Sequence, residues 1–61
     1  MMTMGQAVDT AIKTHESAYP GSEVYQVDVH VSVRFDLRGS YCVELRATHF
    51  SVPLVHYVPI A

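Results

Sequence analysis

The stretch VYQVDVHVSVRFDL, residues 24–37, decides the fold of this 61-residue chain. Its odd positions from 25 to 37 are all apolar, and its even positions from 26 to 36 are all polar. Because successive side chains of a β-strand point to opposite faces, this alternation predicts a strand with one buried face and one solvated face. Valine is its commonest residue, and β-branched side chains favour the pleated surface of a sheet.

The following segment continues the alternation and predicts a second strand. Its odd positions are again apolar: Tyr41, Val43, Leu45 and Ala47. We expect a three-residue turn between the strands, with Gly39 in the left-handed conformation that such a loop requires. Pairing Asp36 with Ser40 keeps both apolar sets on one face of the sheet. This register places Phe35 opposite Tyr41.

A helix and an edge strand flank this hairpin. Thr3 and Gln6 have the spacing of a capping box, and Pro20 with Gly21 is typical of a helix end. Between them, apolar or buried-type residues recur every three or four positions: Met4, Ala7, Val8, Ala11, Ile12 and His15. Near the other end, Pro53 and Pro59 restrict the last segment to a sheet edge, because proline lacks a backbone N–H.

Together these patterns predict an α+β fold in a single domain, residues 1–61. One N-terminal helix, about 4–17, packs on a three-stranded antiparallel sheet with strands about 23–36, 40–49 and 52–58. The element order is α-β-β-β and the strand order is 1-2-3. We expect a dimer, because a chain this small buries only about 60% of its unfolded surface when it folds alone.

Composition narrows the classes of function. The chain has four Lys and Arg against six Asp and Glu, so its formal net charge of -2 disfavours binding to nucleic acid. Cys42 is the single cysteine, which leaves no intrachain disulfide. No apolar run approaches the roughly 18 residues of a membrane span, and no secretion signal is recognised. We therefore expect a cytoplasmic protein that binds no membrane.

The predicted elements differ in length. A strand of thirteen residues extends about 43 Å, whereas fourteen helical residues reach only about 21 Å. We therefore expect the helix to cover the strand only as far as Val31. An apolar patch should remain beyond it, made of Val33, Phe35, Leu37, Tyr41 and Val43. Monomers rarely expose such a patch, so we expect a partner to bind there, with Arg34, Arg38 and Arg46 as polar contacts.

The leading hypothesis is a small, non-catalytic protein-interaction module: an adaptor, an accessory subunit or an inhibitor. It would act with a protein partner, or as a homodimer joined by the edges of the first strand or by stacked hairpin tips. We expect no catalytic residue, cofactor or metal ligand, because no glycine-rich phosphate loop, GxSxG, HExxH or paired-carboxylate motif is present.

Two alternatives belong to other classes of function. The first is a dimeric β-ribbon that binds nucleic acid through His30, Arg34, Arg38 and Arg46. The second is an oligomeric enzyme or metal protein with a site between subunits, around His49, His56 and Tyr57.

The polar face of the hairpin offers one further test of chemistry. In the predicted register, His30 lies opposite Arg46, and Arg34 lies opposite Cys42 and diagonal to Glu44. His30 and Cys42 are then four residues apart along the ladder, about 13 Å, which excludes a hydrogen-bonded thiol–imidazole pair. We therefore expect Cys42 to be an inert side chain and this face to be a solvated surface with exposed ion pairs.

Overall fold

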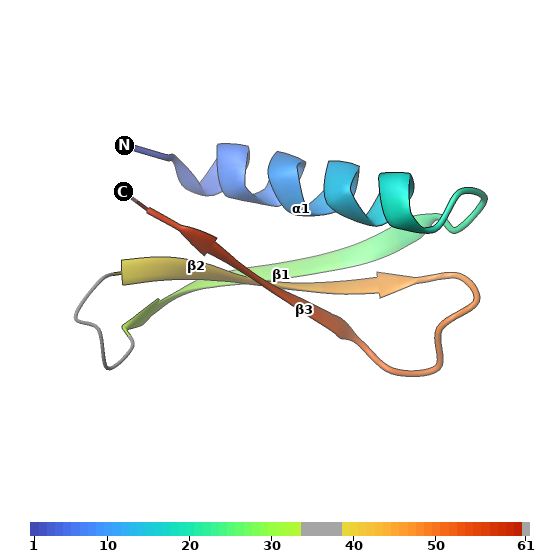
Figure 1. The fold of residues 1–61 in the computed structure, drawn as a ribbon. Helices are drawn as coiled ribbons and strands as arrows, with labels where there is room; N and C mark the ends of the chain where they lie inside the picture. Colours follow the sequence, from blue (N-terminus) through green and yellow to red (C-terminus); the bar gives the residue numbers. More distant parts are fainter. Residues whose placement is uncertain (34–38, 61) are drawn as a thin grey trace.

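The computed structural model describes residues 1–33 and 39–60. They form one helix, α1 (Met4–Ala18), and three strands, β1 (Val24–Val33), β2 (Gly39–Ala47) and β3 (Leu54–Pro59). The strands make one antiparallel sheet in the order β1-β2-β3, and α1 packs on one of its faces (Figure 1). The predicted architecture and strand order are confirmed.

The capping box positions the start of α1. The Thr3 backbone N–H donates to the Gln6 side chain at 2.9 Å, and the Gln6 N–H donates to the Thr3 hydroxyl at 3.1 Å. On the exposed face, Lys13 and Asp9 form an ion pair at 2.9 Å, and this hydrogen bond and charge raise the pKa of Lys13. The chain turns at Gly21, whose φ of 91° is left-handed. No helix of the described residues is long and apolar enough to cross a membrane.

The register of the β1–β2 hairpin differs from the prediction. Val31 lies opposite Tyr41 and Val33 lies opposite Gly39, whereas the prediction paired them with Leu45 and Val43. The pairing of Val33 with Val43 is therefore wrong, although both registers keep the apolar sets on one face. The pairs made by Asp36 and Phe35, and most of the predicted turn, lie outside the described residues.

Gly39 has a different role from the one predicted. It is the first residue of β2 and is not left-handed; the left-handed glycine is Gly21. A Cβ atom added to Gly39 would lie 2.9 Å from Cδ1 of Ile60, whose backbone N–H donates to the Gly39 carbonyl. Close approach of the end of the chain, and not the conformation of a turn, therefore favours glycine at this position.

A β-bulge interrupts β1 near its start. Val24 pairs with Ala47 but Gln26 pairs with Arg46, which leaves Tyr25 as the extra residue. Val24 consequently packs against the core, whereas 64% of the Tyr25 surface is exposed. The expectation that Tyr25 lies on the buried face is wrong, because the bulge reverses the alternation at this point.

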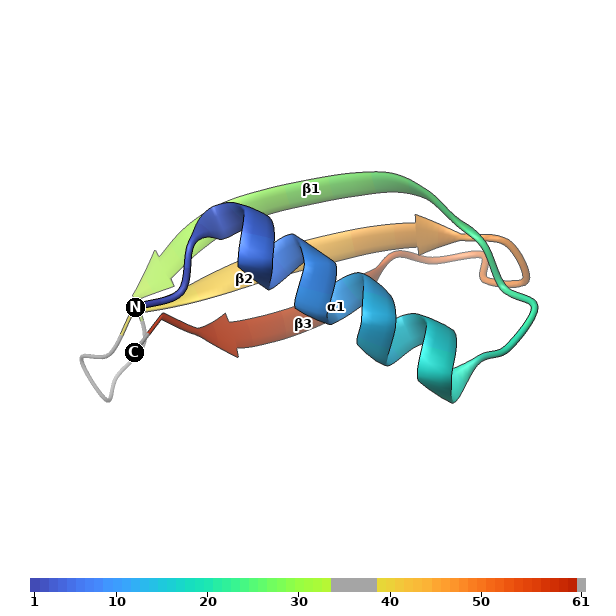
Figure 2. The same cartoon turned by 90° about the horizontal axis from the view of Figure 1, so that it is seen from above.

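The core lies between α1 and the middle of the sheet. Its buried residues are Ala7, Ala11, Val43, Leu45 and Val58. The two alanines lie one turn apart and project little side chain, which allows α1 to approach the sheet closely. Seen from above, α1 crosses the sheet diagonally and leaves much of β1 uncovered along one margin (Figure 2).

The apolar patch predicted beyond the helix is not found in that form. Val43 is fully buried in the chain's own core, because the observed register places it opposite Val29 and His56, in the middle of the sheet. Val31, expected to be covered, is 54% exposed, and Val33 is 74% exposed. The uncovered part of this face therefore lies on β1 and excludes Val43.

Replacement of Leu45 tests this core. Leu45→Ala removes the largest fully buried side chain, so the free energy of unfolding should fall by about 2–5 kcal/mol. Val52→Ala is the control, because Val52 is 63% exposed. Urea denaturation followed by circular dichroism measures both variants, and equal stabilities would contradict the assignment of the core.

Candidate functional site

The free margin of β1 is the candidate site, and we call it the β1 edge (residues 26–33). β1 is an outer strand, and no described segment pairs with its second side. Such a strand presents unpaired backbone N–H and C=O groups that can add a strand from another chain. The edge contains no proline or lysine that would oppose such pairing, and its last two valines, Val31 and Val33, are exposed.

The other margin of the sheet is protected at its end. β3 ends at Pro59, which has no backbone N–H to donate. The next residue, Ile60, accepts a hydrogen bond from the backbone N–H of Met2 at 2.9 Å. The start of the chain therefore occupies the end of the β3 margin, and the β1 edge is the more open of the two.

His30 and Cys42 lie together on the sheet face opposite α1. They are directly opposite one another in the β1–β2 ladder, and Tyr57 of β3 pairs with Cys42 from the other side. The predicted separation of about 13 Å is wrong, because directly opposite residues have Cβ atoms about 4.5–5.5 Å apart. Only 6% of the Cys42 surface is exposed, so its thiol is largely shielded from solvent.

The neighbouring row of the same face brings two acidic residues together. Asp28 lies directly opposite Glu44, an arrangement of like charges that destabilises a sheet. Asp28 accepts one long hydrogen bond, 3.5 Å, from the Gln26 side chain. Among the described residues no basic side chain forms an ion pair with Asp28 or Glu44. The predicted ion pair of Glu44 with Arg34 lies outside the described residues.

A buried polar cluster closes the opposite end of the molecule. His15 is 1% exposed, and its Nε2 atom lies 2.9 Å from the Ser22 hydroxyl. That hydroxyl donates to the Thr48 carbonyl at 2.6 Å, so His15 donates from Nε2 to Ser22. Ser22 is consequently engaged as a structural link between α1 and the β2–β3 loop, and it is not available as a nucleophile.

Aromatic packing completes this cluster. The rings of His15 and Tyr19 lie 5.2 Å apart. Phe50 contacts both rings at centroid distances of 5.5 Å and 4.8 Å. The cluster therefore joins the helix to the loop that precedes β3.

The structure disperses the residues predicted to bind a partner. Val33 is exposed, Tyr41 is half-buried against the core, and Val43 is buried. Arg46 is exposed on the opposite face of the sheet, opposite Gln26. Four of the predicted contacts lie outside the described residues: Arg34, Phe35, Leu37 and Arg38.

The residues of the two alternative sites are also separated. His30 and Arg46, predicted to be opposite one another, lie four residues apart along the ladder. His56 points to the α1 side of the sheet and Tyr57 to the other side, while His49 lies in the β2–β3 loop with a φ of 74°. No three His, Cys, Asp or Glu side chains within residues 1–33 and 39–60 could hold a metal ion.

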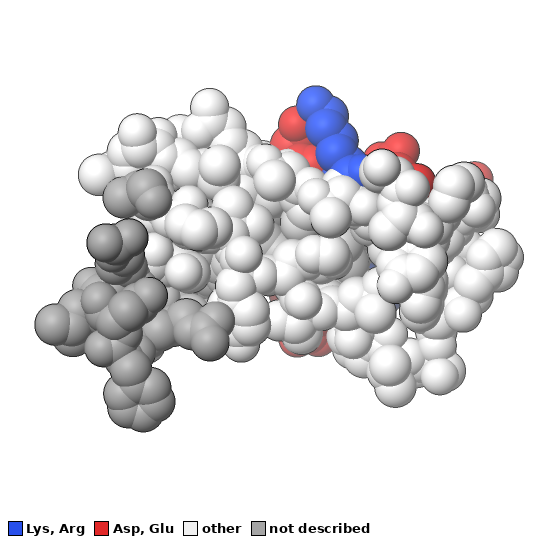
Figure 3. Space-filling model, in the orientation of Figure 1, with Lys and Arg blue, Asp and Glu red and all other residues white. Residues whose placement is uncertain are grey.

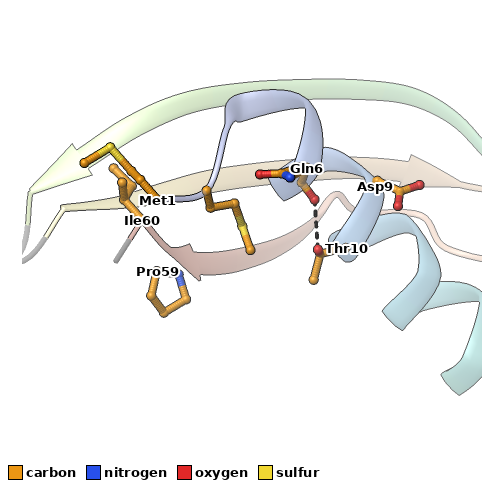
Figure 4. Close-up of a pocket in the computed structure, with 7 residues that line it drawn as sticks. Met1, Gln6, Asp9, Thr10, Pro59 and Ile60 are labelled. Carbon is orange, nitrogen blue, oxygen red and sulfur yellow. Dashed lines mark hydrogen bonds between the residues drawn. The ribbon is translucent and has the colours of Figure 1, made fainter.

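An open groove of about 700 Å³ lies between the start of α1 and the end of β3 (Figure 4). Its lining is mixed: Met1, Met2, Gln6, Asp9, Thr10, Pro59 and Ile60. The Asp9 carboxylate is already paired with Lys13, and the Thr10 hydroxyl donates to the Gln6 carbonyl. On the face seen in Figure 3, charged side chains gather mainly over α1, and the surface over β3 is almost uncharged.

The chain matches no protein-family model, no curated protein and no solved structure. Its candidate site is therefore defined by geometry alone. The sequence-based prediction does not include Val31 or Asp28 among the interface residues. The alternation placed each on the correct face, but their exposure and neighbours depend on the register, which the alternation leaves open.

Removal of the Ser22 hydroxyl tests the buried polar link. Ser22→Ala leaves His15 and the Thr48 carbonyl without this partner, so the free energy of unfolding should fall by about 1–3 kcal/mol. Ser51→Ala, in the exposed part of the same loop, serves as the control. Thermal and urea denaturation should separate the two variants, and an unchanged stability of Ser22→Ala would show that the link contributes nothing.

Proposed function

We propose that this chain is a small, non-catalytic protein-interaction module that binds its partner through the β1 edge. It acts as an adaptor, an accessory subunit or an inhibitor that covers a surface of the partner. The observation that carries the proposal is the open edge of β1, beside which Val31 and Val33 remain exposed. A buried free thiol, Cys42, supports a location in the reducing cytoplasm.

Strand addition is the mode of binding that this geometry favours. An added strand satisfies the backbone groups of the edge, and its side chains alternate between the two faces of the extended sheet. On the α1 side, it would cover Val31 and Val33, which α1 does not reach. On the other side, it would meet the polar row of β1, which includes Asp28 and His30.

The charge of the molecule supports a protein partner. The net charge is negative, and the β1 edge contains an acidic residue and no lysine or arginine. A nucleic-acid surface needs basic side chains that neutralise phosphates, and the described part of this edge offers none. Burial of valines beside a satisfied backbone is instead typical of contacts between proteins.

The double variant Val31→Asp/Val33→Asp tests the proposal in a pull-down from the native host. Two carboxylates in place of the exposed valines should weaken apolar contact and pairing at the edge. The double variant should therefore fail to recover a partner protein that the wild type recovers. Val52→Asp places a charge at a valine whose exposure, 63%, lies between those of Val31 and Val33, away from the β1 edge, and should retain the partner.

Two results would contradict the proposal. The first is equal recovery of the same proteins by the wild type and the double variant. The second is recovery of nucleic acid whose binding weakens steeply as the salt concentration rises, because such salt dependence indicates contacts with phosphates. Circular dichroism confirms that each variant retains its sheet before the comparison.

A further inference from the structure

We propose that the partner at the β1 edge is a second copy of this chain, paired antiparallel about a two-fold axis at Val29. This inference rests on the proposed function and specifies the partner and its register. The result is a continuous six-stranded sheet with both helices on one face. Three features of the described residues favour it: alternation, the acid pair and the uncovered valines.

Alternation limits the possible registers. In an antiparallel pair, directly opposite side chains lie on the same face of the sheet. A pairing in which Val29 meets Val29 places polar residues opposite polar residues and valines opposite valines throughout the β1 edge. A shift of one residue would place Asp28 among the valines of the second copy and leave its carboxylate buried without a partner.

Charge favours the register about Val29 over the registers centred on its two neighbours, Asp28 and His30. About Val29, Asp28 of each copy lies opposite His30 of the other, so the symmetry produces this contact twice. The imidazole N–H can donate to the carboxylate, which supplies a donor to an acid pair that has no basic partner in the described part of one chain. A pairing about Asp28 would instead oppose two carboxylates, and one about His30 would oppose two imidazoles.

The same register covers exposed apolar surface. On the α1 side, Val31 of each copy lies opposite Val27 of the other, and both pairs flank the central pair of Val29 residues. Val31 is 54% exposed in the single chain, whereas Val27 and Val29 are half-buried against its core. The dimer therefore extends the core of each chain across the axis at the place where α1 leaves β1 uncovered.

Disulfide formation tests the position of the axis. In the proposed dimer, residue 29 meets its own copy at a Cα separation of about 4.5–5.5 Å, within the range that a disulfide spans. Under mild oxidation, Val29→Cys should form a covalent dimer in high yield. Val27→Cys and Val31→Cys are matched controls, because each would lie about 13 Å from its own copy and should remain monomeric in a denaturing gel.

The wild type controls for the native thiol, since Cys42 is 6% exposed on the other face of the sheet and should form no intermolecular disulfide. A covalent dimer of Val27→Cys or Val31→Cys equal to that of Val29→Cys would overturn the register.

A charge exchange measures the contact of Asp28 with His30 by sedimentation equilibrium. His30→Asp alone opposes two pairs of carboxylates and should raise the dimer Kd by roughly tenfold or more. The double variant Asp28→His/His30→Asp restores each contact in reverse and should return the Kd to within about threefold of the wild type, if the two sites couple as direct neighbours. Glu16→Gln, on the exposed face of α1, should leave the Kd unchanged.

The failures of the two proposals are distinguishable. A wild-type chain that remains monomeric at millimolar concentration, or a double variant that dimerises no better than His30→Asp, overturns the homodimer. If the wild type nevertheless recovers a different protein that Val31→Asp/Val33→Asp does not, the proposed function stands although the homodimer is overturned. If the wild type and the double variant recover the same proteins and the wild type is also monomeric, both proposals are overturned.

Discussion

Val29 lies opposite Val43 in the β1–β2 ladder, and this register determines what every later element contacts. It places Val43 and Leu45 in the middle of the sheet, where Ala7 and Ala11 of α1 cover them. A register four residues different would keep the same faces but would move these side chains toward the end of the helix. The core, the exposed valines and the neighbours of Asp28 are therefore consequences of one strand pairing.

The helix itself is fixed at both of its ends by polar contacts, and between them its buried side chains are two alanines. At the start, the Thr3 capping box and the hydrogen bond of Met2 to Ile60 hold it near the end of β3. At the far end, His15 reaches the Thr48 carbonyl through Ser22. The two alanines alone specify the position of α1 weakly, and these links add constraints at both of its ends beside the packing of Ile12.

The sequence predicts the elements and their faces well, because period-two alternation and capping are local signals. It does not predict the register, because pairing Asp36 with Ser40 and pairing Val33 with Gly39 satisfy the same parity. The bulge at Tyr25 is not predicted either, because Tyr25 fits the alternation of the residues that follow it; only the apolar Val24 before it breaks the pattern. The predicted role of Gly39 is wrong because a glycine near a turn suggests a left-handed residue, whereas here the missing side chain makes room for Ile60.

The two margins of the sheet differ, and the difference bears on why an unfavourable pair persists. The β3 margin is protected at its end by Pro59 and by Met2, so the β1 edge is the more open of the two to further pairing. Beside that edge, the carboxylates of Asp28 and Glu44 lie opposite one another, and this pair of like charges destabilises the sheet of a single chain. A partner that brings a donor to Asp28 converts this cost into a preference for the assembled state. The proposed symmetric pairing about Val29 would supply that donor from the chain's own sequence, through His30, and so would require no separately evolved surface.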